Sequence, residues 1–166
     1  MPKGSLQVEG QMALQGYGKV LVPVDGSEYA LRAVEHAGSI ALAAGLGVVL
    51  LHVSPMGPLE MMQVMGYPAG AQKLADASAS EFEKVRGEQA EKVIRAARER
   101  LPAVLVVQTI IESGSPAEVI LDHADRLGDV IIVMGNRGLS GLRELVIGSV
   151  SSKVLHHARC PVTIVR

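Results

Sequence analysis

Blocks of apolar residues alternate with amphipathic segments along most of the chain. Five short, nearly continuous apolar runs predict β-strands at 19–25, 48–53, 104–111, 130–134 and 161–166. Between them, apolar residues that recur every three or four positions predict helices at 27–44, 74–101, 115–127 and 149–159. Strands that are apolar throughout are typical of sheets covered on both faces. The order βαβαβαβαβ therefore predicts an α/β fold: a single open five-stranded parallel sheet with helices on both faces.

Helix start and stop residues support this interpretation. Ser27 is a good N-cap, and Ser115-Pro116-Ala117-Glu118 has the form of a capping box with proline at the first helical position. Gly45 and Gly128 follow the last periodic residues of their helices and are expected to end them. The residues predicted to face the core are Ala30, Val34, Ala37, Ala41 and Ala44 on the first helix, and Phe82, Val85, Val93, Ala96 and Ala97 on the second.

Two segments fall outside the alternating pattern. Residues 1–16 have weak periodicity and form an N-terminal extension to a single domain at 17–166. Residues 54–71 hold three prolines, three glycines and four methionines, which predicts a long loop that serves as a lid or a contact surface. The methionines, Met56, Met61, Met62 and Met65, are expected either to form an adaptable contact surface or to fill space over the sheet edge.

The composition narrows the class of protein. The formal net charge is -1 without a lysine or arginine block, which argues against nucleic-acid and membrane-surface partners. The longest apolar stretch, 40–51, is too short to cross a bilayer, and the start of the chain does not read as a signal peptide. The lone Cys160 excludes an internal disulfide and fits a reducing compartment. We therefore expect a cytoplasmic protein.

The run Met134-Gly135-Asn136-Arg137-Gly138 carries the clearest chemical signal. It follows an apolar strand, and Gly148-Ser149 then opens the last helix. Glycines let a phosphate approach the backbone, and the unpaired N–H groups of a helix's first turn point at it. This arrangement predicts an anion site for a phosphorylated ligand, to which the nearby Arg137 and Arg143 could supply charge. The alternative is that these are plain turn glycines.

Asp25 closes the first predicted strand. Ligands of open α/β sheets bind at the carboxyl ends of the strands, where the strand order reverses, so Asp25 is expected to face the glycine loop. A carboxylate there could accept hydrogen bonds from ribose hydroxyls or help to hold a metal ion. The alternative is that Asp25 and Gly26 form only a turn into the helix cap at Ser27.

Other familiar sites are missing from the sequence. No G-x-x-x-x-G-K-[ST] motif occurs, which excludes a P-loop NTPase. His156 and His157 are adjacent, so they point about 100° apart on a helix and do not make a paired metal site. His52 lies inside an apolar strand and is expected to be a hydrogen-bonded structural histidine. The metal ligands stay unknown.

The ordered set of motifs resembles the universal stress protein (UspA-like) family. Gly135, Gly138, Gly148 and Ser149 match its ATP-binding signature G-x2-G-x9-G-[ST]. The resemblance extends over residues 17–166 and includes V-P-V-D-G-S at 22–27, His52-Val53, Gly114-Ser115-Pro116 and the ending at 158–162. It implies a Rossmann-like domain of the adenine nucleotide alpha hydrolase-like type that forms homodimers and binds ATP, usually with Mg²⁺ or Mn²⁺.

The resemblance also implies roles for individual residues. The backbone of Val53 would contact adenine, and Asp25 and Gly135 would contact the ribose. The phosphates would be held by Gly138, Gly148, Ser149, Val150 and Ser151, and Pro23, Val24 and Met134 would line the pocket. The apolar final strand, 161–166, would pair with a second copy across a two-fold axis.

Three functions follow as hypotheses. The first is a nucleotide-dependent sensor or regulator of a stress response that binds ATP as a dimer. The second is an ATP hydrolase or nucleotidyl-transfer enzyme, with Asp25 as metal ligand or base and Arg137 as charge stabiliser; because no residue is dedicated to placing water, turnover should be slow. The third is an interaction module whose pocket is empty or holds another ligand, with the methionine-rich segment as its contact surface.

Overall fold

The computed structural model describes residues 16–66, 72–139 and 147–166. Strands and helices follow one another as the apolar pattern predicts, with one additional helix. The strands are β1 (Lys19–Pro23), β2 (Gly47–Ser54), β3 (Val107–Ser113), β4 (Val130–Gly135) and β5 (Val162–Val165). The helices are α1 (Glu28–Ala44), α2 (Pro58–Val64), α3 (Gln72–Glu99), α4 (Pro116–Leu127) and α5 (Ser149–His157).

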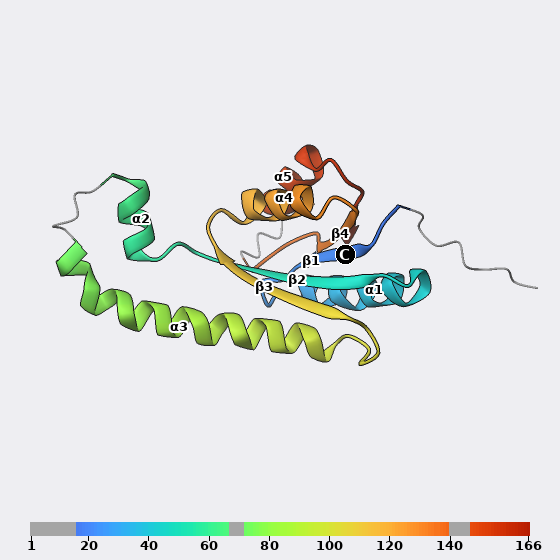
Figure 1. The fold of residues 1–166 in the computed structure, drawn as a ribbon, viewed down its shortest axis with the longest axis horizontal. Coiled ribbons are helices and arrows are strands. Elements are labelled where there is room, and N and C mark those ends of the chain that lie inside the picture. The colour runs from blue at the N-terminus through green and yellow to red at the C-terminus, as the bar shows by residue number, and fades with distance from the viewer. Residues whose placement is uncertain (1–15, 67–71, 140–146) are drawn as a thin grey trace, which may run out of the picture.

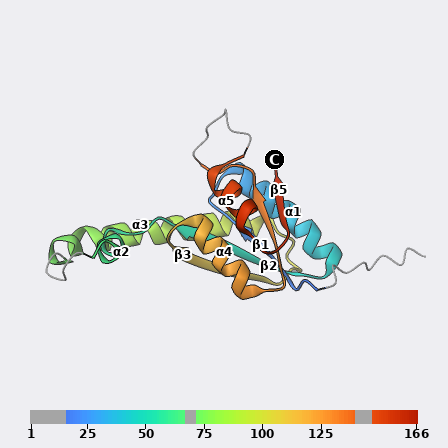
Figure 2. The same cartoon turned by 90° about the horizontal axis from the view of Figure 1, so that it is seen from above.

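The five strands form one parallel sheet in the order β3-β2-β1-β4-β5. α1 and α3 cover one face, and α4 and α5 cover the other (Figures 1 and 2). This confirms the predicted α/β fold with helices on both faces. The order reverses between β1 and β4, so the carboxyl ends of these two central strands open the crevice in which ligands of such sheets bind.

Alternation along the central strands divides the core between the two faces. Val20, Val22 and Leu50 pack with α1 and α3, whereas Leu21 and Leu51 pack with α4 and α5. Successive side chains of a strand point to opposite faces, so a strand covered on both sides must be apolar at every position. The continuous apolar runs in the sequence arise from this requirement.

β3 begins later than the sequence pattern predicts. Residues 104–106 precede the strand, in a turn closed by the bond from Leu105 N–H to the Pro102 carbonyl (3.1 Å). Val104 and Val106 are 78% and 80% exposed. The prediction of a strand from residue 104 was therefore wrong, because β-branched residues favour a strand only when a packed surface receives them.

A helix, α2, lies within the segment predicted to be a loop. Pro58 occupies its first turn, and the Glu60 carboxylate accepts a hydrogen bond from Gly57 N–H (2.8 Å). The prediction of a structureless loop was wrong over Pro58–Val64, and residues 67–71 lie outside the described residues. Met61 and Met65 are 47% and 66% exposed, so these two do not fill space over the sheet. α2 and the start of α3 project beyond the sheet (Figure 1).

Individual helix predictions had mixed outcomes. Gly45, with φ of 68°, and Gly128, with φ of 69°, end α1 and α4 as predicted. On α3, Val93 and Ala97 face the core, but Val85 is 56% exposed and Ala90 takes a core position instead. Other predicted positions are only partly buried: Ala44, Phe82 and Ala96.

The capping box predicted at the start of α4 is not formed. Ser115 is the N-cap, but its side chain makes no capping hydrogen bond. Ser27, in contrast, caps α1 as predicted, because its hydroxyl accepts the Ala30 N–H (3.2 Å).

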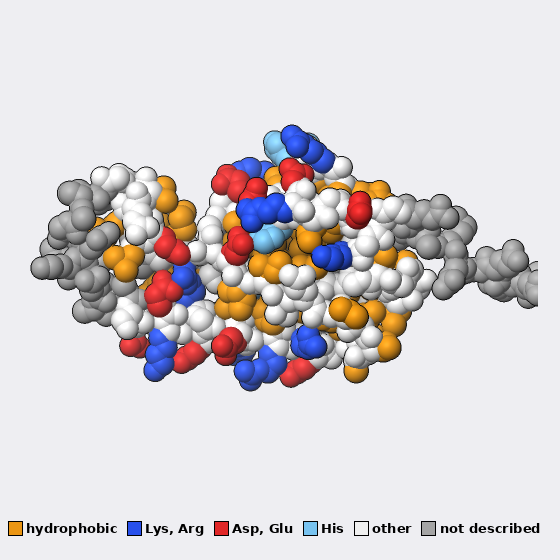
Figure 3. Space-filling view, in the orientation of Figure 1, with side chains coloured by type: hydrophobic (Ala, Val, Ile, Leu, Met, Phe, Trp, Pro, Cys, Tyr) orange, Lys and Arg blue, Asp and Glu red, His pale blue; other side chains and the backbone are white. Residues whose placement is uncertain are grey.

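The sequence also makes predictions about membrane-spanning helices and about the distribution of charge. In the described parts of the chain, no helix is both long and apolar enough to cross a membrane. On the face shown in Figure 3, acidic and basic side chains are interspersed along α3 and over the sheet. This mixture is consistent with the absence of a basic block from the sequence.

Candidate functional site

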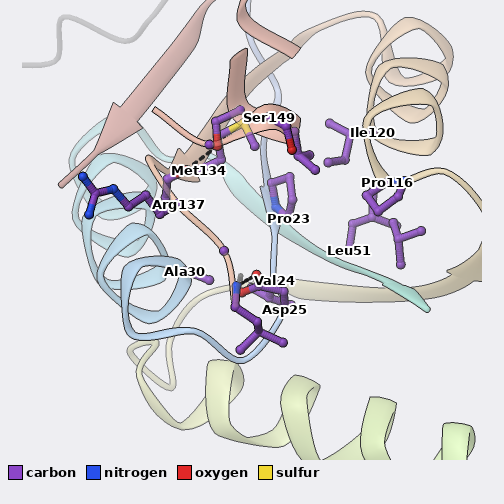
Figure 4. Close-up of a pocket in the computed structure, with 17 residues that line it drawn as sticks. Pro23, Val24, Asp25, Ala30, Leu51, Pro116, Ile120, Met134, Arg137 and Ser149 are labelled. Atoms are coloured by element: carbon purple, nitrogen blue, oxygen red, sulfur yellow. Dashed lines mark hydrogen bonds between the residues drawn. The ribbon is translucent and has the colours of Figure 1, made fainter. Parts of the chain in front are cut away.

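A cleft opens at the carboxyl ends of β1 and β4, where the strand order reverses (Figure 4). The structure brings all twelve predicted site residues to its wall: Pro23, Val24, Asp25, Val53, Met134, Gly135, Arg137, Gly138, Gly148, Ser149, Val150 and Ser151. Five further lining residues were missed by the sequence reasoning: Ala30, Leu51, Pro116, Ile120 and Leu139. Most of these are apolar residues of regular elements, and nothing in the sequence separates them from ordinary core positions.

Asp25 joins the two sides of the cleft. Its Oδ1 accepts a hydrogen bond from Ser27 N–H (2.9 Å) at the start of α1. Its Oδ2 accepts one from Leu139 N–H (3.2 Å) in the loop after β4. The prediction that Asp25 faces the glycine loop is confirmed, and the alternative of a turn into the Ser27 cap holds at the same time.

The three signature glycines lie at close contacts. A Cβ on Gly138 would lie 2.5 Å from Asp25 Oδ2, and one on Gly148 would lie 3.3 Å from the Asn136 carbonyl oxygen. A Cβ on Gly135 would lie 2.7 Å from the carbonyl carbon of Tyr29. None of the three has a positive φ. At Gly135 a side chain would collide with the backbone of α1, so glycine is favoured there by packing within the protein and not by space for a ligand. At Gly138 a side chain would displace the Asp25 carboxylate, and at Gly148 the contact is tight.

The first turn of α5 borders the cleft. Its N-cap is Gly148, which has no side chain to cap the helix and whose N–H donates to the Asn136 carbonyl (2.6 Å). The next three N–H groups, of Ser149, Val150 and Ser151, lack acceptors within the helix. The buried Ser151 hydroxyl donates to the Gly135 carbonyl (2.8 Å) and so ties α5 to the end of β4. The cleft therefore receives backbone N–H groups at the positive end of a helix dipole.

One wall of the cleft is apolar. Leu51, Ile120 and Met134 are almost fully buried, and Val53 and Pro116 complete this wall. The strand register between β1 and β2 ends at the pair Pro23 and Leu51, so β1 turns away before it reaches Val53. The result is a slot with apolar sides and a free strand edge, which suits a flat heterocyclic ring.

Arg137 has a different orientation from the rest of the site. Its backbone belongs to the loop that lines the cleft, but its side chain points away from the other labelled residues (Figure 4). The Nε atom of Arg137 is buried without a hydrogen-bond partner. In this conformation the guanidinium group does not face the cleft. Arg143, the other loop arginine considered above, lies outside the described residues.

The histidines considered above and the single cysteine lie outside the cleft. His52 Nδ1 lies 2.8 Å from the Val24 carbonyl oxygen, which confirms the expected hydrogen-bonded structural histidine. His156 and His157 each pair through Nδ1 with a backbone carbonyl of α5. Burial raises the pKa of the Cys160 thiol, so little reactive thiolate forms near neutral pH.

The cleft supplies few groups that could bind a metal ion. Asp25 is the sole carboxylate among its described lining residues. Across the described part of the chain, no three His, Cys, Asp or Glu side chains gather in a cluster suited to a metal. Mg²⁺ is commonly held by one or two carboxylates together with substrate phosphates and water. Among the described residues, the single carboxylate of Asp25 fits a cation that is held mainly by phosphates.

Comparison with known proteins identifies the family. The Universal stress protein family matches residues 16–166, and the chain belongs to it. The universal stress protein YxiE of Bacillus subtilis is 34% identical over 151 residues, which cover 90% of this chain and 99% of that protein.

Solved structures share the fold. The universal stress protein UspA from Lactobacillus plantarum has a TM-score of 0.61 at 26% identity, with 90% of this chain and 98% of that one covered. A universal stress protein from Archaeoglobus fulgidus, solved in complex with dAMP, has a TM-score of 0.57 at 22% identity, with 90% and 98% covered. At that identity the second likeness concerns the fold alone.

Proposed function

We propose that this universal stress protein binds ATP in the cleft between β1 and β4 and acts as a nucleotide-dependent regulator in the cytoplasm. The observation that carries the proposal is the juxtaposition of three features in one cleft. They are an apolar slot at Val53, a carboxylate at Asp25 and the uncapped first turn of α5. A nucleotide joins a base, a sugar diol and phosphates, so the cleft offers a partner for each of its three parts.

The phosphates would lie against the first turn of α5. Three successive N–H groups, of Ser149, Val150 and Ser151, are available there, and the helix dipole favours an anion by roughly 0.3–1 kcal/mol at an exposed site. Gly138 and Gly148 present no side chain toward this turn, so the phosphate can approach the backbone. The interaction needs no cationic side chain, in agreement with the orientation of the Arg137 side chain away from the other labelled cleft residues.

The ribose would lie beside Asp25. Each of its carboxylate oxygens already accepts one backbone N–H, from Ser27 and from Leu139. An ionised carboxylate has about four lone-pair sites, so two can still accept hydroxyl hydrogen atoms. The two N–H bonds hold the carboxylate in place before the ligand arrives, which reduces the entropy lost on binding.

A divalent cation would be held mainly by the phosphates, with Asp25 as the available carboxylate. When bound, Mg²⁺ would neutralise phosphate charge. Hydrolysis needs a positioned water molecule in addition. The cleft offers no second carboxylate for that task among its described residues. We therefore expect a binding protein with slow turnover at most.

Calorimetric titration with Mg-ATP, combined with an assay for ADP in the recovered sample, tests the proposal. Binding at micromolar concentration with little ADP is the expected result.

Asp25→Ala should lower the affinity for ATP about tenfold or more, because a hydrogen bond to a charged group is lost. The same variant should bind 2′,3′-dideoxy-ATP as the wild type does, since that ligand has no diol for Asp25. The absence of binding by nucleotide-free protein would refute the proposal, and ADP formation faster than about 1 s⁻¹ would favour an enzyme.

A further inference from the structure

Both backbone polar groups of Val24, its N–H and its C=O, bond to residues of β2. Val24 N–H donates to the Leu51 carbonyl (2.8 Å), as in a parallel ladder. The Val24 carbonyl lies 2.8 Å from His52 Nδ1, and His52 is only 8% exposed. A carbonyl can only accept, so Nδ1 must carry the hydrogen atom of this bond. A side chain therefore supplies a bond at the position where the strand pairing stops.

In a continued parallel ladder, the Val24 carbonyl would accept the N–H of Val53. The register instead ends one residue earlier, at Pro23 and Leu51. The Val24 carbonyl accepts its hydrogen bond from the His52 ring in place of the Val53 N–H. The Val24 carbonyl therefore has a partner although the ladder bond is missing. A buried carbonyl without a partner would be costly.

The backbone groups of Val53 are consequently turned toward the cleft. Alternate residues of a strand direct their N–H and C=O groups to opposite neighbours. On β2, Val48 and Ser54 bond to the β3 side, whereas Leu51 bonds to the β1 side. Val53 shares the orientation of Leu51, but β1 has already turned away beside it. Its N–H and C=O therefore face the apolar slot.

We propose that His52 is the residue that sets base selectivity, because its ring holds the Val24 carbonyl and keeps the Val53 N–H and C=O free for a purine edge. The inference rests on the proposed function. Adenine offers a ring nitrogen that accepts and an amino group that donates, which complement one N–H and one C=O. Hypoxanthine reverses donor and acceptor at the same two positions, so the pair should reject it. His52 acts through Val24 and Val53 and is a positioning residue that touches no ligand.

Two variants at one position separate this role from a structural one. In His52→Asn, an amide N–H can take the place of Nδ1–H and donate to Val24. In His52→Leu, no donor remains, and the Val24 carbonyl is expected to pair with Val53 N–H. Calorimetry with three probes, ATP, ITP and inorganic tripolyphosphate, gives the readout for the wild type and both variants.

The expected result is a pattern, not a single loss. His52→Leu should lower the affinity for ATP about tenfold, to a value close to the affinity for ITP, while tripolyphosphate binds as in the wild type. His52→Asn should keep the preference of the wild type for ATP. Unchanged ATP selectivity in His52→Leu overturns this inference alone, and so does an equal loss for tripolyphosphate, which indicates a general structural effect. Wild-type protein that binds no adenine nucleotide overturns the proposed function as well.

A second measurement needs no variant, in case His52→Leu does not fold. Hydrogen–deuterium exchange followed by NMR reports on the Val53 amide in the wild type. It should exchange faster than the Val24 amide, which is bonded to Leu51, and become protected when ATP is added. Protection of Val53 before ATP is added would overturn the inference.

Discussion

At the scale of single residues, the contact between Gly138 and Asp25 is the most sensitive point of the cleft. A methyl group on Gly138 would lie 2.5 Å from Asp25 Oδ2, well inside contact distance. The carboxylate would have to rotate, and its bond to Leu139 N–H would be lost. We expect Gly138→Ala to lower the affinity for ATP about tenfold, measured by calorimetry, because the Asp25 carboxylate is no longer positioned to bind the ribose.

Gly87 provides the matched control for that substitution. It lies within α3, where nothing comes within 4 Å of an added Cβ. Gly87→Ala should leave ATP affinity unchanged and stabilise the fold by about 0.5–1 kcal/mol, seen as a higher midpoint of thermal unfolding. Wild-type ATP affinity in Gly138→Ala would show that the position of Asp25 is not critical for binding.

The residue scale also separates what the sequence could predict from what it could not. The approach of Asp25 to the glycine loop was predictable, since adjacent parallel strands bring their carboxyl ends to one edge. The reason for glycine at position 135 was not, because it depends on how closely Tyr29 of α1 packs against β4. The use of the Ser151 hydroxyl to hold Gly135 is likewise a tertiary contact without a sequence signal.

At the scale of elements, α2 is held in place by the carboxylate of Glu60. It accepts hydrogen bonds from the Ser113 hydroxyl (2.6 Å), Gly57 N–H (2.8 Å) and Arg86 (2.9 Å). These bonds, that of Ser113 foremost, lower the pKa of Glu60 below its ordinary value. One side chain thus connects α2 to the end of β3 and to α3.

The lowered pKa predicts how the docking of α2 depends on pH. A carboxyl group with a lower pKa in the folded state stabilises fully above its unfolded pKa of about 4.3. This stabilisation is lost as the pH falls through the lower folded-state value. Glu60→Gln should mimic the acid state at neutral pH, and amide exchange over Pro58–Val64 should accelerate.

Glu83→Gln is the control for Glu60→Gln. Glu83 is paired with Arg86 (2.5 Å) on the same helix, and its side chain is 46% exposed. Ion pairs of this kind contribute little, so exchange over α2 should stay close to that of the wild type. Equal acceleration in the two variants would mean that general charge, not the Glu60 contacts, holds α2.

Elements were predictable where burial and sequence pattern agree. The four helices first predicted and the five strands have the periodicities that the two-sided sheet requires. α2 was missed because its N-cap is Gly57, so the usual polar cap residue is absent although Glu60 bonds back to the cap N–H. Val104 and Val106 have strand propensity but no surface to pack on, and propensity alone could not reveal this.

At the scale of the whole molecule, the sheet has two edges, β3 and β5. The bonds from Ile132 N–H to the Pro161 carbonyl and from Asn136 N–H to the Val165 carbonyl turn these residues toward β4. Alternate residues point the other way, so the N–H and C=O groups of Val162 and Ile164 face outward. An apolar edge with outward backbone groups can pair with another chain, and we propose that it joins two copies through residues 161–166.

Two substitutions at Ile164 test this dimer. Ile164→Pro removes an outward N–H that β4 does not use, and Ile164→Ala keeps it; both lose the side chain that packs on the core. Light scattering after size-exclusion chromatography at micromolar concentration should find the wild type and Ile164→Ala as dimers and Ile164→Pro as a monomer.

The dimer and the cleft are expected to be independent. β5 bonds to β4 beside the cleft, whereas its outward edge faces away from the cleft, so monomeric Ile164→Pro should still bind ATP. Dimeric Ile164→Pro would place the interface elsewhere, and loss of ATP binding on dissociation would mean that the cleft needs the second copy.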